Sequence, residues 1–250
     1  MPILPTNSPF SERFPCSNLV KYLMLVELVV AALNQSPMGY IQLPSGPKIE
    51  LIRIAGNADL PTFWIGKFEI RNDQYRAFIQ ETGYDGSDHP SSKTNEPFLA
   101  DWKKGSFPAG KAAYPAAYLN WHHSTKFCVW LSQKSGRKVA LPTQAQWYWA
   151  AAGAQKRKFP WGMEWAKNRC NIGGASDGFA ESAPVGSFPL GATPEGVHDM
   201  AGNIWEWTSD GFLRGGPWCM GPETVECDSA ADEGIDRADD KFGFRIVVTD

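Results

Sequence analysis

Five cysteines are the residues of this 250-residue chain best suited to redox or soft-metal chemistry. Their count is odd, and no two of them have the CxxC or CxxxxC spacing of a zinc knuckle. The sequence therefore implies neither a zinc knuckle nor a disulfide framework. Free thiols in a reducing compartment are the simplest interpretation, which favours a cytoplasmic location. The cysteines are Cys16, Cys128, Cys170, Cys219 and Cys227.

Oxygen-bearing side chains frame a short glycine-containing loop between Asn171 and Asp177. Calcium takes six to eight hard oxygen ligands, and loop carbonyls often supply several of them. The two side chains and this loop therefore predict a structural calcium site. The alternative is a loop held by Asx turns with no ion, because only two side-chain ligands are visible.

Acidic residues are concentrated in residues 219–241, which hold eight carboxylates and two basic side chains. The net charge of the whole chain is −3, so the remaining residues are slightly basic. This run is either a solvated face, a set of carboxylates that hold a cation, or a surface for a basic partner. No basic face stands out elsewhere, so nucleic acid is not an expected partner.

Other catalytic patterns are absent from the sequence. His122 and His123 are adjacent, and neighbouring residues on a helix point about 100° apart, so a shared metal ion is not expected. No P-loop, GxGxxG fingerprint or Ser-His-Asp arrangement is present. The cysteines, the 171–179 loop and the acidic run remain as the candidate sites.

Local patterns predict the elements that position these residues. Residues 48–70 alternate in polarity around turn residues and predict a hairpin. Helices are expected from the N-cap Asn72 to Thr82, over residues 123–135, and from Thr143, where a capping box begins. Beyond residue 160 only short apolar pieces are expected.

A long loop and many aromatic rings mark the rest of the chain. Residues 84–118 show no clear period, and a loop of that length in a compact domain predicts a wall or a ligand surface. Eleven Trp, 24 Gly and 19 Pro predict a loop-rich fold with an aromatic core.

Residues 1–45 are predicted to form an N-terminal extension before a domain at 46–250. The extension contains an apolar stretch at 17–33 that is interrupted by Glu27. Because a membrane span needs about 20 apolar residues, we expect a buried or partner-facing amphipathic helix rather than a span. If this stretch is a signal anchor instead, the protein would be surface-displayed or secreted.

Eight short motifs, in order across residues 62–250, resemble the domain of formylglycine-generating enzymes (sulfatase-modifying factors) and of the variable proteins of diversity-generating retroelements. This resemblance implies an α+β, C-type-lectin-like fold with two main helices, small antiparallel sheets and long loops. The motifs are Phe63–Tyr75, Leu119–Trp121, Ala140–Ala152, Phe159–Gly162, Ala183–Pro189, Val197–Trp207, Arg214–Trp218 and Gly243–Arg245.

Several motif residues are expected to support the scaffold. Trp205 and Trp207 alternate on a predicted strand and should point into the core. Arg245 is expected to pair with a buried carboxylate, and Gly215-Gly216 permits a positive φ or a close backbone approach.

The resemblance also implies ligands for calcium. Ile172 and Phe179 match positions at which the family supplies backbone carbonyls to a structural calcium ion, beside Asn171 and Asp177. A second, weaker set matches the motif that contains Asn203, Ile204 and Glu206.

The family's oxidases imply a different chemistry for the thiols. They carry two Cys about five residues apart after the RGG segment, and these soft thiolates bind copper. Cys219 lies near the first of these positions, but the second falls near Thr224, and Cys227 is eight residues from Cys219. A copper-dependent cysteine oxidase that uses Cys219, with or without Cys227, is therefore the alternative function.

The preferred function is non-catalytic binding of a protein or other ligand. Retroelement variable proteins carry their diversified segment between the RGG and GFR motifs, where this chain has its acidic run. The 84–118 loop is a candidate neighbour, and docking of a scaffold component through the 17–33 helix is a second alternative. The ligand identity and the oligomeric state are left open. The candidate ligand-binding residues are Trp218, Cys219, Met220, Glu223, Glu226, Asp228, Asp232, Asp236, Arg237, Asp239 and Asp240.

Overall fold

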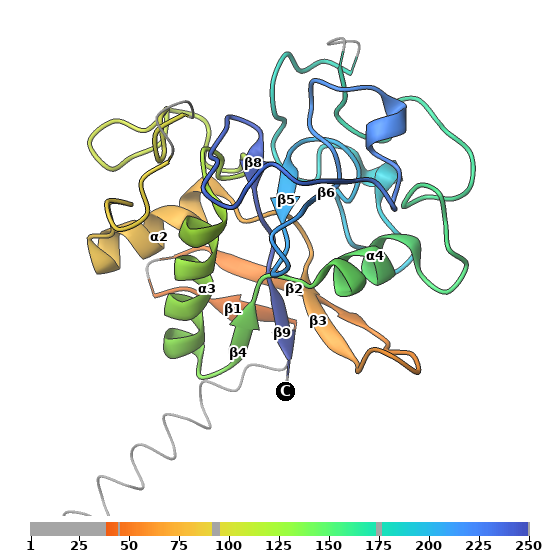
Figure 1. The fold of residues 1–250 in the computed structure, drawn as a ribbon, viewed down its shortest axis with the longest axis horizontal. Helices are drawn as coiled ribbons and strands as arrows, with labels where there is room; N and C mark the ends of the chain where they lie inside the picture. Colours follow the sequence, from red (N-terminus) through yellow and green to blue (C-terminus); the bar gives the residue numbers. More distant parts are fainter. Residues whose placement is uncertain (1–38, 45, 92–95, 174–176, 250) are drawn as a thin grey trace, which may run out of the picture. The chain divides into compact units, whose positions relative to one another are not determined.

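A five-stranded antiparallel sheet forms the centre of the computed structural model, which describes residues 39–44, 46–91, 96–173 and 177–249. The spatial order of its strands is β1-β2-β3-β9-β4 (Figure 1). The predicted hairpin is confirmed, since β2 and β3 pair with Leu51 opposite Gly66. The strands are β1 (Tyr40–Gln42), β2 (Lys48–Ile54), β3 (Phe63–Gly66), β4 (Lys138–Ala140) and β9 (Val247–Thr249).

The sheet begins before the domain boundary that the sequence predicted at residue 46. Strand β1 pairs with β2 in the register Tyr40 to Glu50 and Gln42 to Lys48. Three residues are too few to show the alternating polarity of a strand, so the sequence analysis placed them in the N-terminal extension. The predicted helix at 17–33 lies outside the described residues.

Three helices pack against the sheet: α2 (Asn72–Thr82), α3 (Trp121–Ser135) and α4 (Gln144–Ala152). The capping box of Thr143 and Gln146 is present at α4. The N-cap of α2 is Arg71 rather than the predicted Asn72, whose side chain instead donates to the carbonyl of Lys111. Helix α3 starts two residues earlier than predicted because Asn120 caps it.

Both faces of the sheet are covered, which explains its apolar strands. One face packs against α2 and α3 around Tyr75 and Phe127, and the other packs against α4 around Trp147. Successive residues of β9 point to opposite faces, so Val248 joins the first cluster and Val247 the second. Figure 1 shows α2 and α3 on one side of the strands and α4 on the other.

A second sheet has the strand order β7-β6-β5-β8, in which β5 and β8 run parallel and the other pairs run antiparallel. Trp205 and Trp207 on β5 are buried, as predicted. Two short 3₁₀ helices complete the described elements. The strands are β5 (Trp205–Trp207), β6 (Leu213–Arg214), β7 (Ala230–Ala231) and β8 (Phe242–Gly243), and the 3₁₀ helices are η1 (Pro189–Gly191) and η2 (Pro222–Thr224).

A buried ion pair supports this second sheet, as the sequence predicted for Arg245. Its guanidinium donates to both oxygens of Glu206 on β5, at 2.6 and 2.7 Å. Gly215 and Gly216 have φ values of 94° and 76°, which confirms the expected positive φ. Within the described ranges, no helix is both long and apolar enough to cross a membrane.

Candidate functional site

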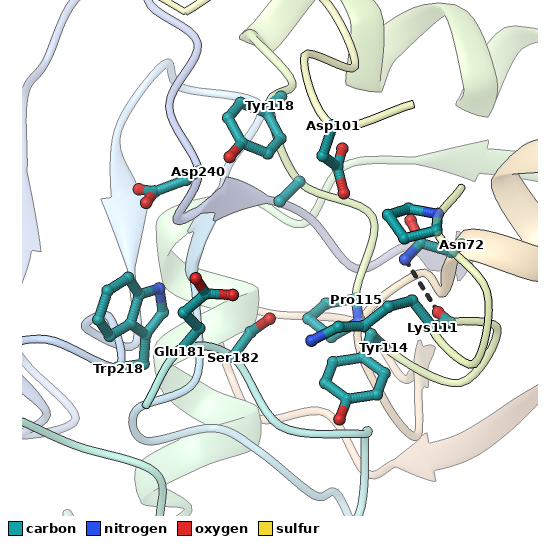
Figure 2. Close-up of a pocket in the computed structure, with 12 residues that line it drawn as sticks. Asn72, Asp101, Lys111, Tyr114, Pro115, Tyr118, Glu181, Ser182, Trp218 and Asp240 are labelled. Carbon is teal, nitrogen blue, oxygen red and sulfur yellow. Dashed lines mark hydrogen bonds between the residues drawn. The ribbon is translucent and has the colours of Figure 1, made fainter. Parts of the chain in front are cut away.

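A solvent-accessible pocket of about 230 Å³ lies where four separate chain segments meet (Figure 2). The long loop that the sequence singled out supplies most of its wall, and the start of α2 supplies its edge. Trp218 and Asp240 come from the acidic C-terminal region. The lining residues are Asn72, Asp101, Pro108, Lys111, Tyr114, Pro115, Ala117, Tyr118, Glu181, Ser182, Trp218 and Asp240.

The loop wall is fixed to the first turn of α2. The backbone N–H of Asn72 donates to the carbonyl of Tyr114 at 2.9 Å, and its side-chain amide donates to the carbonyl of Lys111 at 3.0 Å. The backbone N–H of Asn72 lies in the first turn of the helix, where N–H groups have no partner within the helix. The side chains of Lys111 and Tyr114 are therefore held on a rigid element.

Tyr118 joins two walls of the pocket. Its φ is 58°, a left-handed conformation that a bulky residue rarely adopts. Its N–H donates to the carbonyl of Asp239, and its carbonyl accepts from the N–H of Leu99. Such local strain persists only where the surroundings fix it, and it is common at functional sites.

Asn203 holds the opposite wall in place. Its carbonyl accepts from the N–H of Trp218 at 2.8 Å, and its side-chain oxygen accepts from the N–H of Ala183 at 2.8 Å. Asn171 adds a bond from its side-chain amide to the carbonyl of Glu181 at 2.9 Å. The two asparagines therefore position Trp218 and Glu181 relative to each other.

The pocket has an excess of negative charge. It presents the carboxylates of Asp101, Glu181 and Asp240, with Lys111 as the one cationic side chain in its lining. Asp240 pairs with Lys241 at 3.2 Å. Asp101 and Glu181 form no salt bridge with any residue that the structure describes.

The surroundings shift several pocket pKa values upward. Desolvation raises the pKa of Asp101, and Glu181 adds to this rise while Lys111 opposes it. Desolvation, followed by the neighbouring carboxyl of Asp239, raises the pKa of Asp240. Burial and then nearby carboxylates raise the pKa of Tyr118 to about 12. Desolvation, which disfavours the charged form of an acid, is the largest cause of all three shifts.

The acidic residues of the 219–241 segment lie in several different environments. Of the predicted ligand-binding residues, only Trp218 and Asp240 line the pocket. Several others are engaged with neighbours: Glu226 with Lys158, Asp236 with His122, Arg237 with Glu233 and Asp239, and Asp232 with the N–H of Gly234. Cys219, Met220, Glu223 and Asp228 are exposed to solvent outside the pocket lining.

Sequence reasoning did not single out Asp101, Lys111, Tyr114, Tyr118 and Glu181 as site residues. The available signal was the unusual length of the 84–118 loop, which predicted a ligand surface without indicating which of its side chains face inward. Glu181 follows a different loop and carried no such signal.

The two C-terminal thiols lie in different environments. Cys219 is exposed, and the charges that act on it belong to Lys241, Asp240 and Asp239. Cys227 is buried, with Arg157, Asp228 and Arg214 as its charged neighbours, and its pKa is raised by burial to about 12. Of these two thiols only Cys219 is open to solvent, and the two share no charged neighbour.

The predicted calcium loop retains a free oxygen donor. The Oδ1 atom of Asn171 is buried and has no hydrogen-bond partner among the described residues. Asp177 accepts from the N–H groups of Ile172 and Phe179, and the second of these bonds forms an Asx turn, the feature of the alternative without an ion. Carboxylate oxygens that accept one bond keep a second lone pair. The donors therefore fit a hard cation such as calcium.

The side chains of Asn203 and Glu206, from the second predicted calcium set, already accept hydrogen bonds within this structure. The side-chain oxygen of Asn203 accepts from Asn171 and Ala183, and both carboxylate oxygens of Glu206 accept from Arg245. Glu206 also accepts from the indole N–H of Trp147. Ile204, which lies between Asn203 and Glu206 in the sequence, is fully buried. The side chains of this set act in the scaffold.

Known proteins similar to this chain agree with the fold. The "Inactive C-alpha-formylglycine-generating enzyme 2" of Bos taurus is 28% identical over 175 residues, which cover 59% of this chain and 56% of that protein. The chain thus spans little more than half the length of this curated relative. Among solved structures, PvdO from Pseudomonas aeruginosa matches with a TM-score of 0.68 at 19% identity, covering 86% of this chain and 99% of that one.

Treponema denticola variable protein 1 is similar in fold, with a TM-score of 0.64 at 18% identity over 84% of this chain and 98% of that one. These structural matches confirm the predicted mixed α and β, C-type-lectin-like fold. The family model for the sulfatase-modifying factor enzyme 1-like domain matches residues 37–250, which include β1. The chain therefore belongs to the formylglycine-generating-enzyme (sulfatase-modifying factor) family.

Proposed function

We propose that this chain is a non-catalytic binding member of its family and that its ligand surface centres on the pocket formed by Asp101, Tyr118, Glu181, Trp218 and Asp240. The observation that carries the proposal is an open, carboxylate-lined pocket in a chain whose two C-terminal thiols lie in different environments. An aromatic ring and several polar groups that converge in one concavity are typical of binding sites.

Two relatives support a binding role. One, described as an inactive formylglycine-generating enzyme, is similar in sequence, and the other, described as a variable protein, is similar in fold. A fold by itself does not determine function, so the argument depends on the site. The different environments of Cys219 and Cys227, one exposed and one buried, are the feature of the site that disfavours the oxidase alternative.

Copper loading tests the non-catalytic part of the proposal. The full chain would be incubated with Cu(I), and bound copper and oxygen-dependent oxidation of a Cys-containing peptide would be measured. We expect no tightly bound copper and no turnover, because one thiol is exposed and the other is buried among different charged neighbours, so the two do not form a two-thiolate copper site. Turnover that disappears in Cys219→Ser and persists in Cys128→Ser would overturn the proposal.

Selection from a displayed peptide library tests the binding part. Peptides selected on the full chain should lose binding to Trp218→Ala, which removes the aromatic wall of the pocket. They should retain binding to Leu190→Ala, which truncates an exposed apolar side chain outside the pocket lining. Equal losses in both variants, or none in either, would contradict a binding surface at this pocket.

We further propose that calcium is a structural cofactor of the 171–179 loop. The buried Oδ1 of Asn171 supports this proposal, because a buried polar atom without a partner is costly unless a ligand satisfies it. Asp177 and the carbonyl groups of Ile172 and Phe179 would complete the protein ligands. When bound, the ion would fix the loop that carries Asn171, and Asn171 in turn holds Glu181.

A further inference from the structure

We propose that an apolar patch formed by Trp161, Met163, Trp165 and Leu190 is the contact through which two copies of this chain form a symmetric dimer. None of these residues lines the pocket described above, so the inference is independent of the binding role proposed there. Its basis is the exposure of the apolar side chains, the fixed arrangement of the two loops that carry them, and opposite charges at the edge of the patch.

The two most exposed large apolar side chains of the described residues both belong to this patch. Leu190 is 68% exposed and Met163 is 58% exposed, ahead of Val129 at 51%. Trp161 and Trp165 flank Met163 in the sequence and are half-buried, and their ring centroids are 5.8 Å apart. Single exposed apolar residues are ordinary on a protein surface, but a contiguous group of them marks an interaction site.

Arg169 joins the two loops that form the patch. Its guanidinium donates to the carbonyl of Leu190 and lies 6.0 Å from the centroid of the Trp161 ring. The two backbones also touch, because a Cβ atom at Gly191 would collide with the carbonyl oxygen of Arg169. Leu190 is therefore held beside the tryptophan pair, although the two loops are separate in the sequence.

The tryptophan rings are fixed from the inside of the molecule. Phe159 is buried and stacks on Trp161 with ring centroids 5.3 Å apart, and its ring meets that of Trp165 edge-on at 5.5 Å. The indole N–H of Trp161 donates to the carbonyl of Glu164 at 3.0 Å. A patch that is already ordered loses little conformational entropy when it associates.

The edge of the patch carries charges of both signs. Glu164 and Lys167 are exposed, and neither forms a salt bridge with a residue that the structure describes. Arg169 adds a second positive charge, which is engaged with Leu190 and Trp161. An anionic membrane would attract the lysine and repel the glutamate, whereas a protein partner can match both.

A second copy of the patch supplies the complement of each charge. An interface with twofold symmetry is self-complementary, so Glu164 of one subunit can face Lys167 of the partner subunit, and the reverse pair forms at the same time. Twofold dimers are also the commonest soluble oligomers. The residue types agree with a protein contact, because Trp, Met and Arg are enriched at interfaces.

Sedimentation velocity of the full chain over a series of concentrations tests the proposal. We expect a reversible monomer–dimer equilibrium. Met163→Glu and Leu190→Glu should each weaken the dimer at least tenfold, because each places a charge in the apolar centre of the contact. Both positions are exposed in the single chain, so the fold should be retained. Val129→Glu is the matched control, since it introduces the same charge at an exposed apolar position on α3, and it should dimerise as the parent does.

An exchange of charges tests the symmetry of the contact. Glu164→Lys and Lys167→Glu should each weaken the dimer by about threefold or more, because each brings like charges together across the twofold axis. The double variant Glu164→Lys/Lys167→Glu pairs opposite charges again and should dimerise within about twofold of the parent. A contact between the patch and any other surface would instead add the two losses.

The dimer assignment fails on any of three results. These are a monomer at every concentration up to about 100 μM, a dimer that persists in both Met163→Glu and Leu190→Glu, and an exchanged double variant that dimerises more weakly than either single variant. A monomer that binds phosphatidylserine vesicles and loses this binding in Met163→Glu would assign the patch to a lipid surface instead.

Discussion

Lys111 is the residue whose charge opposes the excess of negative charge in the pocket. Its ammonium lies over Tyr114 inside the pocket, where it offsets part of the negative charge of Asp101. We therefore predict that Lys111→Met raises the pKa of Asp101 further, because the ammonium that stabilises its carboxylate is removed. An NMR titration of the Asp101 carboxyl group in the parent and in the variant measures this change.

The control for that prediction is Lys104→Met, which removes an exposed positive charge from the same loop but from outside the pocket lining. Its effect on the pKa of Asp101 should be small and should disappear as salt screens the charge. An unchanged or lowered pKa of Asp101 in Lys111→Met would contradict the prediction.

Among the residues that line the pocket, some could be predicted from the sequence and others could not, because their side-chain directions depend on long-range hydrogen bonds. Trp218 and Asp240 were identified because a motif and a run of acidic residues marked their neighbourhood. Asp101 and Glu181 belong to loops without a period, and side-chain direction in such loops depends on long-range bonds such as that from Asn171 to the Glu181 carbonyl. No local pattern encodes those bonds.

A buried histidine, His123, accepts one of the capping hydrogen bonds at the N-terminus of α3, and this bond requires an unprotonated Nδ1. His123 accepts the N–H of Asn120 through Nδ1, and its Nε2 lies 3.0 Å from the carbonyl of His89. Desolvation lowers the pKa of His123 to about 4, the charge of His122 acts in the same direction, and Asp88 opposes it. Protonation of Nδ1 would remove the acceptor of the capping bond.

We predict that the His123 contribution to stability is complete above about pH 6.5, the usual pKa of histidine in an unfolded chain, and is lost as the pH falls towards 4. Between these pH values the folded state disfavours protonation of His123, so the protein takes up a proton when it unfolds. The free energy of unfolding therefore falls by about 3 kcal/mol. His123→Gln keeps a capping-box acceptor and removes this titration. Urea unfolding at pH 7 and pH 4.5 should show a smaller acid loss in this variant than in the parent.

His122→Gln is the matched control, since it replaces the adjacent imidazole, which contacts Asp236 at the helix surface. It should retain the acid loss that belongs to His123. Equal acid losses in the parent and in His123→Gln would contradict the assignment.

The 171–179 loop gives a second prediction at the scale of elements. Adding calcium to protein treated with a chelator should raise the melting temperature, since a ligand that binds only the folded state at 100 times its dissociation constant adds about 2.7 kcal/mol. Asn171→Ala should abolish this response because it removes the free Oδ1. Asp228→Asn, at an exposed position, should retain it, and a parent that does not respond to calcium would contradict the site.

The elements themselves were largely predictable because their signals are local. Gly83 and Gly136 end α2 and α3 in the left-handed conformation, and the Thr143 capping box starts α4. The short strand β1 and the exact N-cap of α2 were not predictable in this way. Both depend on partners distant in sequence: β1 on pairing with β2, and α2 on the Lys111 segment that engages Asn72.

For the whole molecule, the order of the motifs predicted the family and the fold because each motif makes contacts with other motifs. Trp147 in one motif donates to Glu206 in another, and Glu206 accepts from Arg245 in a third. Arg245 also donates to the carbonyl groups of Gly66 on β3 and of His198. One guanidinium therefore links the two sheets.

This link leads to a prediction for global stability. Arg245→Met should destabilise the protein by about 3–5 kcal/mol, because it leaves Glu206 buried and unpaired and also removes the donors to three backbone carbonyls. In Arg245→Met/Glu206→Gln the uncompensated charge is gone, while the amide oxygen introduced by Glu206→Gln can still accept from Trp147. The double variant should therefore be more stable than Arg245→Met alone. Urea unfolding of the parent, the two single variants and the double variant would give the coupling free energy between Arg245 and Glu206. If the destabilisation of the double variant instead equals the sum of the destabilisations of the two single variants, the stabilising role of Arg245 lies in its bonds to the backbone rather than in the ion pair.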